Sequence, residues 1–485
     1  MKIRSVPARC AVALVAAFMG AGVVGCGPQR PAPVSRPAPA LAGVHSCQAA
    51  ELGAGADPGV AFRGPGGVTF SCATLSVPLD HPGLRSNPHQ PGQLALQVAM
   101  ADNTTARHGV LVWLVGGPGA PGVSLTSVIA RQLDPAVLRD YRLVLISTRG
   151  TGTGALSCPQ LQQVMNQNNL AVPTPGVVRA CADTIGDDRR FFTTTDTIAD
   201  LDALRQGLSV RRLTLAGSSY GAFVAERYAI THPDRVSRLV LDSVVPHDTF
   251  DPMAIAVFNR TAEVLRMVCA QAHCTSDPAA DLSAVIQARH NGPELLATLS
   301  SLTHGAPRLT SLPEVLHRAA RGEYTALDAI IAGEKDQPDS TAEVFSQGLF
   351  AATVCADFAW PWGDADAPVP ARVDAVAKAV DALPDATIFP YDRVTATGSA
   401  VVATCEQWPP TPRMAFPSGV DLPRVPTLLL AGDHDLITPL AWTQHEAAHA
   451  PQGRLVIIPG AGHITQNKDN PPAGREAVTR FLTGS

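Results

Sequence analysis

The 485-residue chain contains few charged and few aromatic side chains, which make up 16% and 5% of its residues. Its formal net charge is only −5, and its 37 lysines and arginines form no cluster. Because a nucleic-acid-binding surface concentrates positive charge, this composition argues against nucleic acid as a partner. The cysteines form no Cys-x-x-Cys pair and have no histidine-rich cluster beside them, so we expect no metal site and no cofactor.

Long apolar runs are also scarce, and the longest one lies at the N-terminus. Residues 10–24 follow a basic start and are apolar, but the run is short for a membrane span. This pattern is typical of an export signal. The small residues before Cys26 resemble a bacterial lipobox, which predicts that residues 1–25 are a lipoprotein signal peptide and that Cys26 is lipidated. The alternative is an ordinary secretory signal that is cleaved near Gly25.

The segment after Cys26 is rich in proline. Residues 26–43 contain too many prolines to pack as a helix or strand, so we expect an extended linker. Two or three acyl chains on Cys26 would hold the protein on the extracytoplasmic face of the cell membrane. No later stretch is long and apolar enough to cross the bilayer.

The cysteines agree with an oxidising compartment. Apart from one in the signal segment and the predicted lipidation site, the chain has an even set that we expect to form disulfides. These residues are Cys47, Cys72, Cys158, Cys181, Cys269, Cys274, Cys355 and Cys405. The residues alone leave about 105 pairings open.

Short apolar runs separated by helix-like segments predict an α/β fold with a mostly parallel sheet. The runs at 110–115, 143–146, 213–216 and 236–241 are expected to be buried strands, after a strand pair at 68–79 and 94–100. The spacing of apolar residues from Ile198 to Leu208 predicts a helix that packs on the sheet, with Asp200 and Asp202 on its solvated face.

The alternation of strands and helices stops in the middle of the chain. Residues 246–411 contain mainly helical patterns, which we interpret as a helical cap inserted into the fold. Residues 44–245 and 412–485 would form the core on either side of it. Since core and cap would share one active site, we treat them as one functional unit.

The motif Gly-x-Ser-x-Gly at residues 217–221 directly follows an apolar run and precedes a helical segment. In a strand-turn-helix elbow, only small residues fit two positions before and after the serine, and the turn exposes the hydroxyl. The motif therefore predicts Ser219 as a nucleophile. The alternative is a plain turn.

An acid and a histidine follow Ser219 in the chain, each just beyond an apolar run. The order Ser219, Asp435, His463 is that of a hydrolase triad, whose members lie at the carboxyl ends of parallel strands. His463 would take the serine proton, and Asp435 would orient the imidazole. Asp433 is the alternative acid.

A glycine-rich loop at residues 116–119 follows another apolar run. Acyl transfer needs N–H donors for the negative charge that develops on the substrate oxygen. We expect one donor near Gly117 and another at Tyr220, directly after the predicted nucleophile.

Together these motifs resemble the secreted actinobacterial branch of the α/β-hydrolases related to prolyl iminopeptidases and tripeptidyl aminopeptidases. The resemblance is carried by residues 76–82, the loop 116–119, residues 149–152, the Ser219 elbow, Cys405 with 408–409, and Asp435 with 438–439. It implies the α/β-hydrolase fold with a helical cap, and the roles given above to Ser219, Asp435 and His463. It also implies the disulfides Cys47–Cys72, Cys158–Cys181, Cys269–Cys274 and Cys355–Cys405.

An enzyme that recognises a free α-amine needs a carboxylate at its pocket, because a buried ammonium must be paired. Asp357 and Glu323 are the candidates, with Glu406 behind them. We therefore expect an exported serine hydrolase that releases N-terminal residues or short peptides. A carboxylesterase or lipase-like enzyme with the same triad and an ester substrate is the alternative, and a non-catalytic surface-binding lipoprotein is a remote one.

Overall fold

The computed structural model describes residues 39–55, 61–85, 91–336, 338–363, 367–412, 414, 416–417 and 419–484. The predicted signal peptide, Cys26 and most of the predicted linker lie outside the described residues. From Pro39 onward the chain forms one compact unit. Within the described residues, no helix combines the length and the apolar character that a membrane crossing requires.

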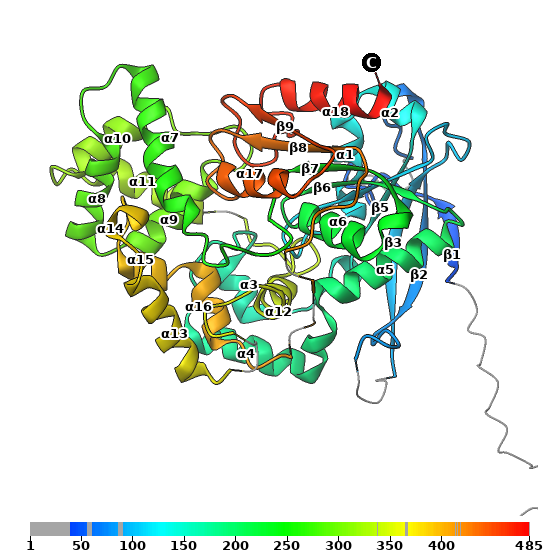
Figure 1. Ribbon diagram of the computed structural model, residues 1–485, viewed down its shortest axis with the longest axis horizontal. Helices are drawn as coiled ribbons and strands as arrows, with labels where there is room; N and C mark the ends of the chain where they lie inside the picture. The colour runs from blue at the N-terminus through cyan, green and yellow to red at the C-terminus, as the bar shows by residue number, and fades with distance from the viewer. Residues whose placement is uncertain are drawn as a thin grey trace, which may run out of the picture. The chain divides into compact units, whose positions relative to one another are not determined.

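One sheet of nine strands organises the described part of the chain, in the order β1-β2-β3-β5-β4-β6-β7-β8-β9 (Figure 1). Strands β1 to β3 pair antiparallel, β3 is also antiparallel to β5, and the remaining pairs are parallel. The predicted α/β fold with a mostly parallel sheet is confirmed. The strands are β1 (Leu41–Ser46), β2 (Phe70–Pro78), β3 (Gln93–Ala101), β4 (Val110–Leu114), β5 (Arg142–Ile146), β6 (Leu213–Ser218), β7 (Val236–Asp242), β8 (Thr427–Gly432) and β9 (Gly453–Ile458).

The edge strand β1 begins inside the segment that the sequence indicates as a linker. Most of its side chains are exposed. The sequence therefore lacks the run of apolar residues that predicts the central strands. It is held by main-chain pairing with β2.

The central strands are largely apolar because helices cover both faces of the sheet. Every residue of β4 and β6 is buried. On one face, Val112 and Leu215 pack with side chains of α5 (Thr194–Gly207) and α6 (Tyr220–Thr231). On the other face, the neighbouring residues Leu111 and Ala216 pack with α2 (Pro135–Asp140) and α18 (Ala473–Thr483).

Between β7 and β8 the described chain contains helices and no strand of the sheet. Figure 1 shows these helices gathered beside the sheet, away from β1. They are α7 (Ala256–Ala272), α8 (Pro278–Arg289), α9 (Gly292–Ser301), α10 (Leu312–Ala319), α11 (Thr325–Lys335), α12 (Gln347–Asp357), α13 (Val369–Asp381), α14 (Asp385–Ile388), α15 (Arg393–Thr397) and α16 (Ala400–Gln407).

Two helices that precede β6 in the chain also belong to this helical body. Side chains of α3 (Pro159–Met165) and α4 (Pro175–Ile185) share an apolar cluster with α7, α12 and α16. The disulfide Cys158–Cys181 connects the start of α3 to α4. The helical body is therefore built from two separate parts of the chain.

The structure contains four disulfides. They are Cys47–Cys72, Cys158–Cys181, Cys269–Cys274 and Cys355–Cys405, the same pairs that the family resemblance implies. The first joins the segment after β1 to β2, and the last joins α12 to α16. Each therefore ties neighbouring elements together locally.

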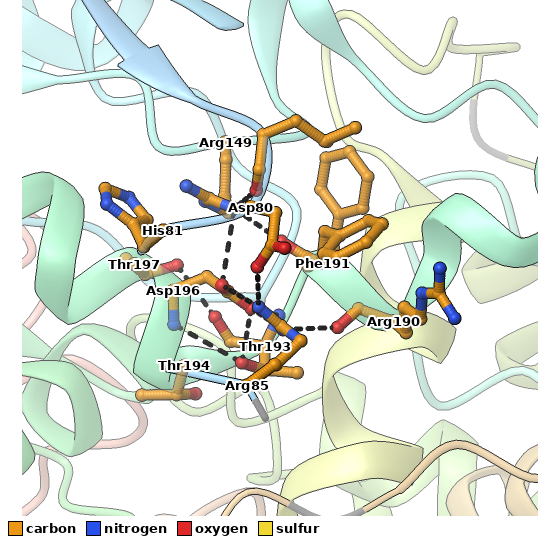
Figure 2. Close-up of polar contacts among 12 residues, drawn as sticks. Asp80, His81, Arg85, Arg149, Arg190, Phe191, Thr193, Thr194, Asp196 and Thr197 are labelled. Atoms are coloured by element: carbon orange, nitrogen blue, oxygen red, sulfur yellow. Dashed lines mark hydrogen bonds and ion pairs between the residues drawn. The ribbon is translucent and has the colours of Figure 1, made fainter. Parts of the chain in front are cut away.

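A buried arginine, Arg149, lies at the centre of an ionic network that joins the chain after β2 to α5 (Figure 2). The side chain of Arg149 is fully buried, and its Nε and Nη2 each lie 2.7 Å from a carboxylate oxygen of Asp200. Its Nη1 donates to the main-chain oxygens of Leu79 and Phe191. The predicted solvated face of α5 is thus wrong for Asp200, and also for Asp202, which is buried beside Arg205. The loop that carries Arg149 covers Asp200, whereas Asp202 is in contact with Tyr228 and Arg235.

A second arginine extends the network to the strand hairpin. Arg85 donates to Asp196 at 2.7 Å and to Asp80 at 3.1 Å, and its guanidinium also binds the main chain of Arg190. His81 lies 2.7 Å from Asp200. The network therefore ties the chain after β2 to the first two turns of α5.

We predict that Arg149→Met destabilises the protein by about 3–5 kcal/mol, because it leaves the Asp200 carboxylate buried without its cation. Denaturant unfolding with the disulfides intact measures this change. The control is Arg480→Met, since Arg480 and its ion-pair partner Glu476 are 56% and 58% exposed and the change should stay within about 0.5 kcal/mol. Equal stabilities of the two variants would contradict the structural role of Arg149.

Candidate active site

Ser219 lies in the turn between β6 and α6, at φ 56° and ψ −126°. A Cβ at Gly217 would collide with the main chain of Gly221, and one at Gly221 would collide with the carbonyl oxygen of Leu114. Both glycines are therefore required by close approach of the backbone. This is the strand-turn-helix elbow that the motif indicates, with the serine at its tip.

The glycine-rich loop after β4 lies directly beside the serine. A Cβ built on Gly116 would lie 3.4 Å from Oγ of Ser219. Gly117 has φ 121°, a conformation that favours glycine. Tyr220 opens α6, where the first N–H groups have no partner within the helix. Both predicted oxyanion donors therefore belong to segments that adjoin Ser219.

Asp435 and His463 form a buried hydrogen bond, with 2.9 Å between Oδ2 and Nδ1. The Thr438 hydroxyl donates to the same Oδ2 at 2.8 Å and lies 3.1 Å from Nδ1. The main-chain N–H groups of Ile437 and Thr438 donate to Oδ1. Burial alone would raise the pKa of Asp435, but His463 and these donors outweigh it and lower that pKa. The Asp435 carboxylate is therefore ionised, and it is hydrogen-bonded to His463, to the Thr438 hydroxyl and to two main-chain N–H groups.

Asp433, the alternative acid, binds other groups. Its Oδ1 accepts from Nδ1 of His434 and from the N–H of Gly460, both at 2.6 Å. Its main-chain oxygen accepts from Arg260. Of the two carboxylates, Asp435 is the one in contact with His463.

The end of β7 connects the serine elbow to the histidine loop. The main-chain oxygen of Asp242 accepts from the N–H of Ser219 at 2.9 Å. Its carboxylate accepts from the N–H groups of Thr465 and Gln466. The Oγ of Ser243 accepts a further bond from the N–H of Ile464 at 2.8 Å. Asp242 and Ser243 therefore set the position of the histidine loop relative to the serine elbow.

A segment between α9 and α10 packs against the histidine loop from the cap side. The carbonyl of Thr303 accepts from the N–H of His463 at 2.7 Å, and the N–H of Gly305 donates back to His463. The Thr303 hydroxyl accepts from the N–H of Leu436, next to Asp435. Burial, with a smaller effect of the adjacent His463, lowers the pKa of His304 to about 4, so this imidazole is neutral at pH 7.

The three cap acids are placed differently. Asp357 is buried and accepts from the N–H of Thr194 at 2.7 Å, and burial raises its pKa. Glu323 is exposed and pairs with Arg318 at 2.9 Å. Glu406 is half-buried on α16, and burial raises its pKa to about 7. The structure gives Asp357 and Glu323 protein partners, whereas Glu406 has no ion-pair partner among the described residues.

A family model described as alpha/beta hydrolase fold matches residues 109–469. The chain belongs to this family. The sequence-based assignment to the α/β-hydrolases is therefore confirmed. Among solved structures, a putative non-heme bromoperoxidase of Mycobacterium tuberculosis is 19% identical, with TM-score 0.38, and the match covers 82% of this chain and 99% of that one.

Two curated relatives carry peptidase names. A tripeptidyl aminopeptidase of Streptomyces lividans is 29% identical, over 36% of this chain and 35% of its own length. The serine protease Hip1 of Mycobacterium tuberculosis is 25% identical, over 87% of this chain and 86% of its own length. The chain thus spans about a third of the tripeptidyl aminopeptidase that it matches. These names support the assignment of the chain as an enzyme.

Sequence reasoning missed the residues that hold the site together. Asp242 is the last residue of the buried strand β7. Its position at the end of an apolar run is the sequence feature that indicates a role at the site. Thr438 was found only as part of a motif shared with the family. Thr303 lies in the segment between α9 and α10, far from His463 in the sequence, and no local pattern indicates the contact between them.

We predict that Gly462→Ala destabilises the protein by about 1–3 kcal/mol, since the new methyl group would collide with the carbonyl oxygens of Thr303 and Gly305. Thermal and denaturant unfolding report the change. Gly176→Ala is the matched control, because a Cβ on Gly176, in α4, meets no atom within 4 Å. A Gly462→Ala variant as stable as this control would contradict the close packing of the cap segment on the histidine loop.

Proposed function

We propose that the protein is a serine hydrolase in which Ser219 attacks an acyl carbon. The hydrogen bond between Asp435 and His463 carries the proposal, since it fixes the imidazole tautomer with the proton on Nδ1 and leaves Nε2 as the base. His463 would accept the Ser219 proton as the new bond forms, and then return it to the leaving group. Water would release the acyl group from Ser219 by the same steps in reverse.

The negative charge on the tetrahedral intermediate would be bound by main-chain donors. The N–H groups of Gly117 and Tyr220 are proposed for this task because their segments adjoin Ser219. Tyr220 is held at its far end by a 2.7 Å hydrogen bond between its hydroxyl and Thr194. Loss of one such donor typically costs about 3 kcal/mol of transition-state stabilisation.

For the substrate, we propose peptides with a free N-terminus, from which the enzyme releases residues or short peptides. The names of the relatives support this choice. Glu406 is the cap acid that we assign to the substrate ammonium, since Asp357 and Glu323 are already bound by protein groups. The same occupation of Asp357 and Glu323 favours the second candidate, a carboxylesterase that needs no amine-binding acid.

We further propose that the enzyme is exported and anchored by lipid at Cys26, on the lipobox pattern of the sequence. Four disulfides in the structure support an oxidising compartment. The cap would comprise residues 246–411, with α3 and α4 packed into it.

We predict that Asp435→Asn lowers kcat by about 10⁴-fold, because the amide cannot stabilise the required imidazole tautomer and its positive charge. Hydrolysis of an activated ester measures the loss. Asp433→Asn is the control and should retain most of the activity, since its partners are His434 and Gly460. A larger loss in the Asp433 variant would assign the catalytic acid to that residue.

We predict that the enzyme prefers free to N-acetylated peptide amides, and that Glu406→Gln removes the preference by raising KM for the free peptides alone. The Glu406 pKa of about 7 adds a pH dependence: below that pKa the neutral acid cannot pair with an ammonium. KM for free peptides should therefore fall as pH rises through about 7, and the variant should lose this change.

The measurement is kcat/KM on matched chromogenic tripeptide amides, with Ser219→Ala as the blank. Hydrolysis of a short acyl ester without hydrolysis of either amide would establish the esterase. A free-amine preference that survives in Glu406→Gln would assign amine recognition to another group. Residual activity in Ser219→Ala would contradict the nucleophile itself.

A further inference from the structure

The chain entering the cap is joined to α17 (Leu440–Ala448) along a seam rich in histidine and acid side chains. His247 binds Glu446 at 2.9 Å, and Nε2 of His445 lies 2.9 Å from Oδ2 of Asp248. The Trp442 indole donates to Asp251 at 3.0 Å. The seam lies outside the triad, and α17 begins directly after the loop that carries the proposed catalytic acid.

At this seam, Asp248, His445 and His449 each offer one donor atom, and these atoms all lie within 4.8 Å of one another. His445 and His449 are four residues apart, so one turn of α17 brings their imidazoles to the same side. Asp248 comes from the loop after β7. No such cluster is visible in the primary structure, because only folding brings the acid from nearly 200 residues away in sequence to the two imidazoles.

We propose that Asp248, His445 and His449 bind a divalent transition-metal ion of the Zn²⁺ type. Two imidazoles with one carboxylate are a donor set that suits Zn²⁺, whereas Ca²⁺ and Mg²⁺ prefer oxygen donors alone. Zinc–ligand bonds are about 2.0–2.2 Å long, so two donors of one ion lie at most about 4.4 Å apart. Small rotations of these half-buried side chains would bring all three donors within that range.

The surroundings supply an orienting group and a negative charge. Nδ1 of His449 lies 3.2 Å from Oδ1 of Asp421, so this carboxylate can hold the imidazole and leave Nε2 as a donor. Metal-bound histidines commonly bind a carboxylate in this way through their second nitrogen. The side chains of His445 and His449 are 27% and 29% exposed, which gives an ion access and leaves room for water as a further ligand.

The layer beneath the proposed site is acidic and incompletely paired. Glu226 and Glu446 are fully buried, and neither carboxylate oxygen of Glu226 has a hydrogen-bond partner among the described residues. The ring centroids of His247 and His449 lie 5.9 Å apart, so this layer is close to the proposed ligands. Burial and the neighbouring Glu446 raise the pKa of Glu226. A dication near this layer would favour the ionised form of Glu226.

Coordination through Nε2 of His445 would shift this imidazole to the tautomer that carries its proton on Nδ1, and the hydrogen bond to Asp248 would be replaced by binding of both groups to the ion. The ion would then clamp the start of the cap to the helix that follows the acid loop.

The test uses the full chain after treatment with EDTA and dialysis, titrated with Zn²⁺ by calorimetry and with Co²⁺ by visible absorption. One equivalent of Co²⁺ should produce an absorption band of low-symmetry coordination, and Zn²⁺ should raise Tm in a concentration-dependent way. His449→Gln should weaken binding by at least about tenfold, and His445→Gln with His449→Gln should abolish it.

His273→Asn with His290→Asn is the matched control, because both residues are exposed and end other helices. This pair should bind Zn²⁺ like the unchanged protein. If the double His445 and His449 variant proves unstable without metal, the single variant at the half-exposed His449 carries the test. Binding of neither ion, or binding that survives in His449→Gln and is lost only in His247→Gln, would overturn the proposal; the latter result would place the ion in the buried layer. None of these readouts depends on hydrolysis.

Discussion

The fully buried carboxylate of Asp242 holds the two halves of the proposed active site in register. Its burial alone raises its pKa, and the donors from Thr465 and Gln466 oppose that effect. The same residue binds the N–H of Ser219 through its main-chain oxygen. A displacement at the end of β7 would therefore move the nucleophile and the base together. Their relative position depends on the sheet rather than on contact between their own side chains, as preorganised catalysis requires.

The helical body between β7 and β8 is bonded to three segments near Ser219. Thr303 binds the segment of His463, the N–H of Ser346 donates to Gly119 in the glycine loop, and Asp357 accepts from Thr194 at the start of α5. These contacts are main-chain bonds or fully buried ones, so they are lost only if the packed layers separate. The helical body is thus fixed to the sheet at these three points, beside the proposed active site.

Local patterns were enough to predict the central strands, the serine elbow and the chain order of the acid and histidine. Each of those features is encoded within about ten residues, by apolar runs or by glycines that permit a close approach. Features that depend on distant contacts were not predicted. Asp200 reads as a surface residue on its own helix, and only the folded loop carrying Arg149 buries it. The same holds for strand β1, for the packing of α3 and α4 with the helical body, and for the contact between Thr303 and His463.

The cap acids show how burial separates a structural carboxylate from one that can recognise a ligand. Asp357 lost its water on folding, and the N–H of Thr194 replaces part of that solvation. A substrate ammonium would have to compete with this donor. Glu406 is also desolvated, as its raised pKa shows, but its missing counter-charge is not supplied by the described part of the chain. A bound ammonium would supply it, lower the pKa of Glu406 and recover the desolvation free energy at the moment of binding. In the proposed aminopeptidase, such a carboxylate would favour a cationic substrate over a neutral one of the same shape, which is a discrimination that an esterase does not need.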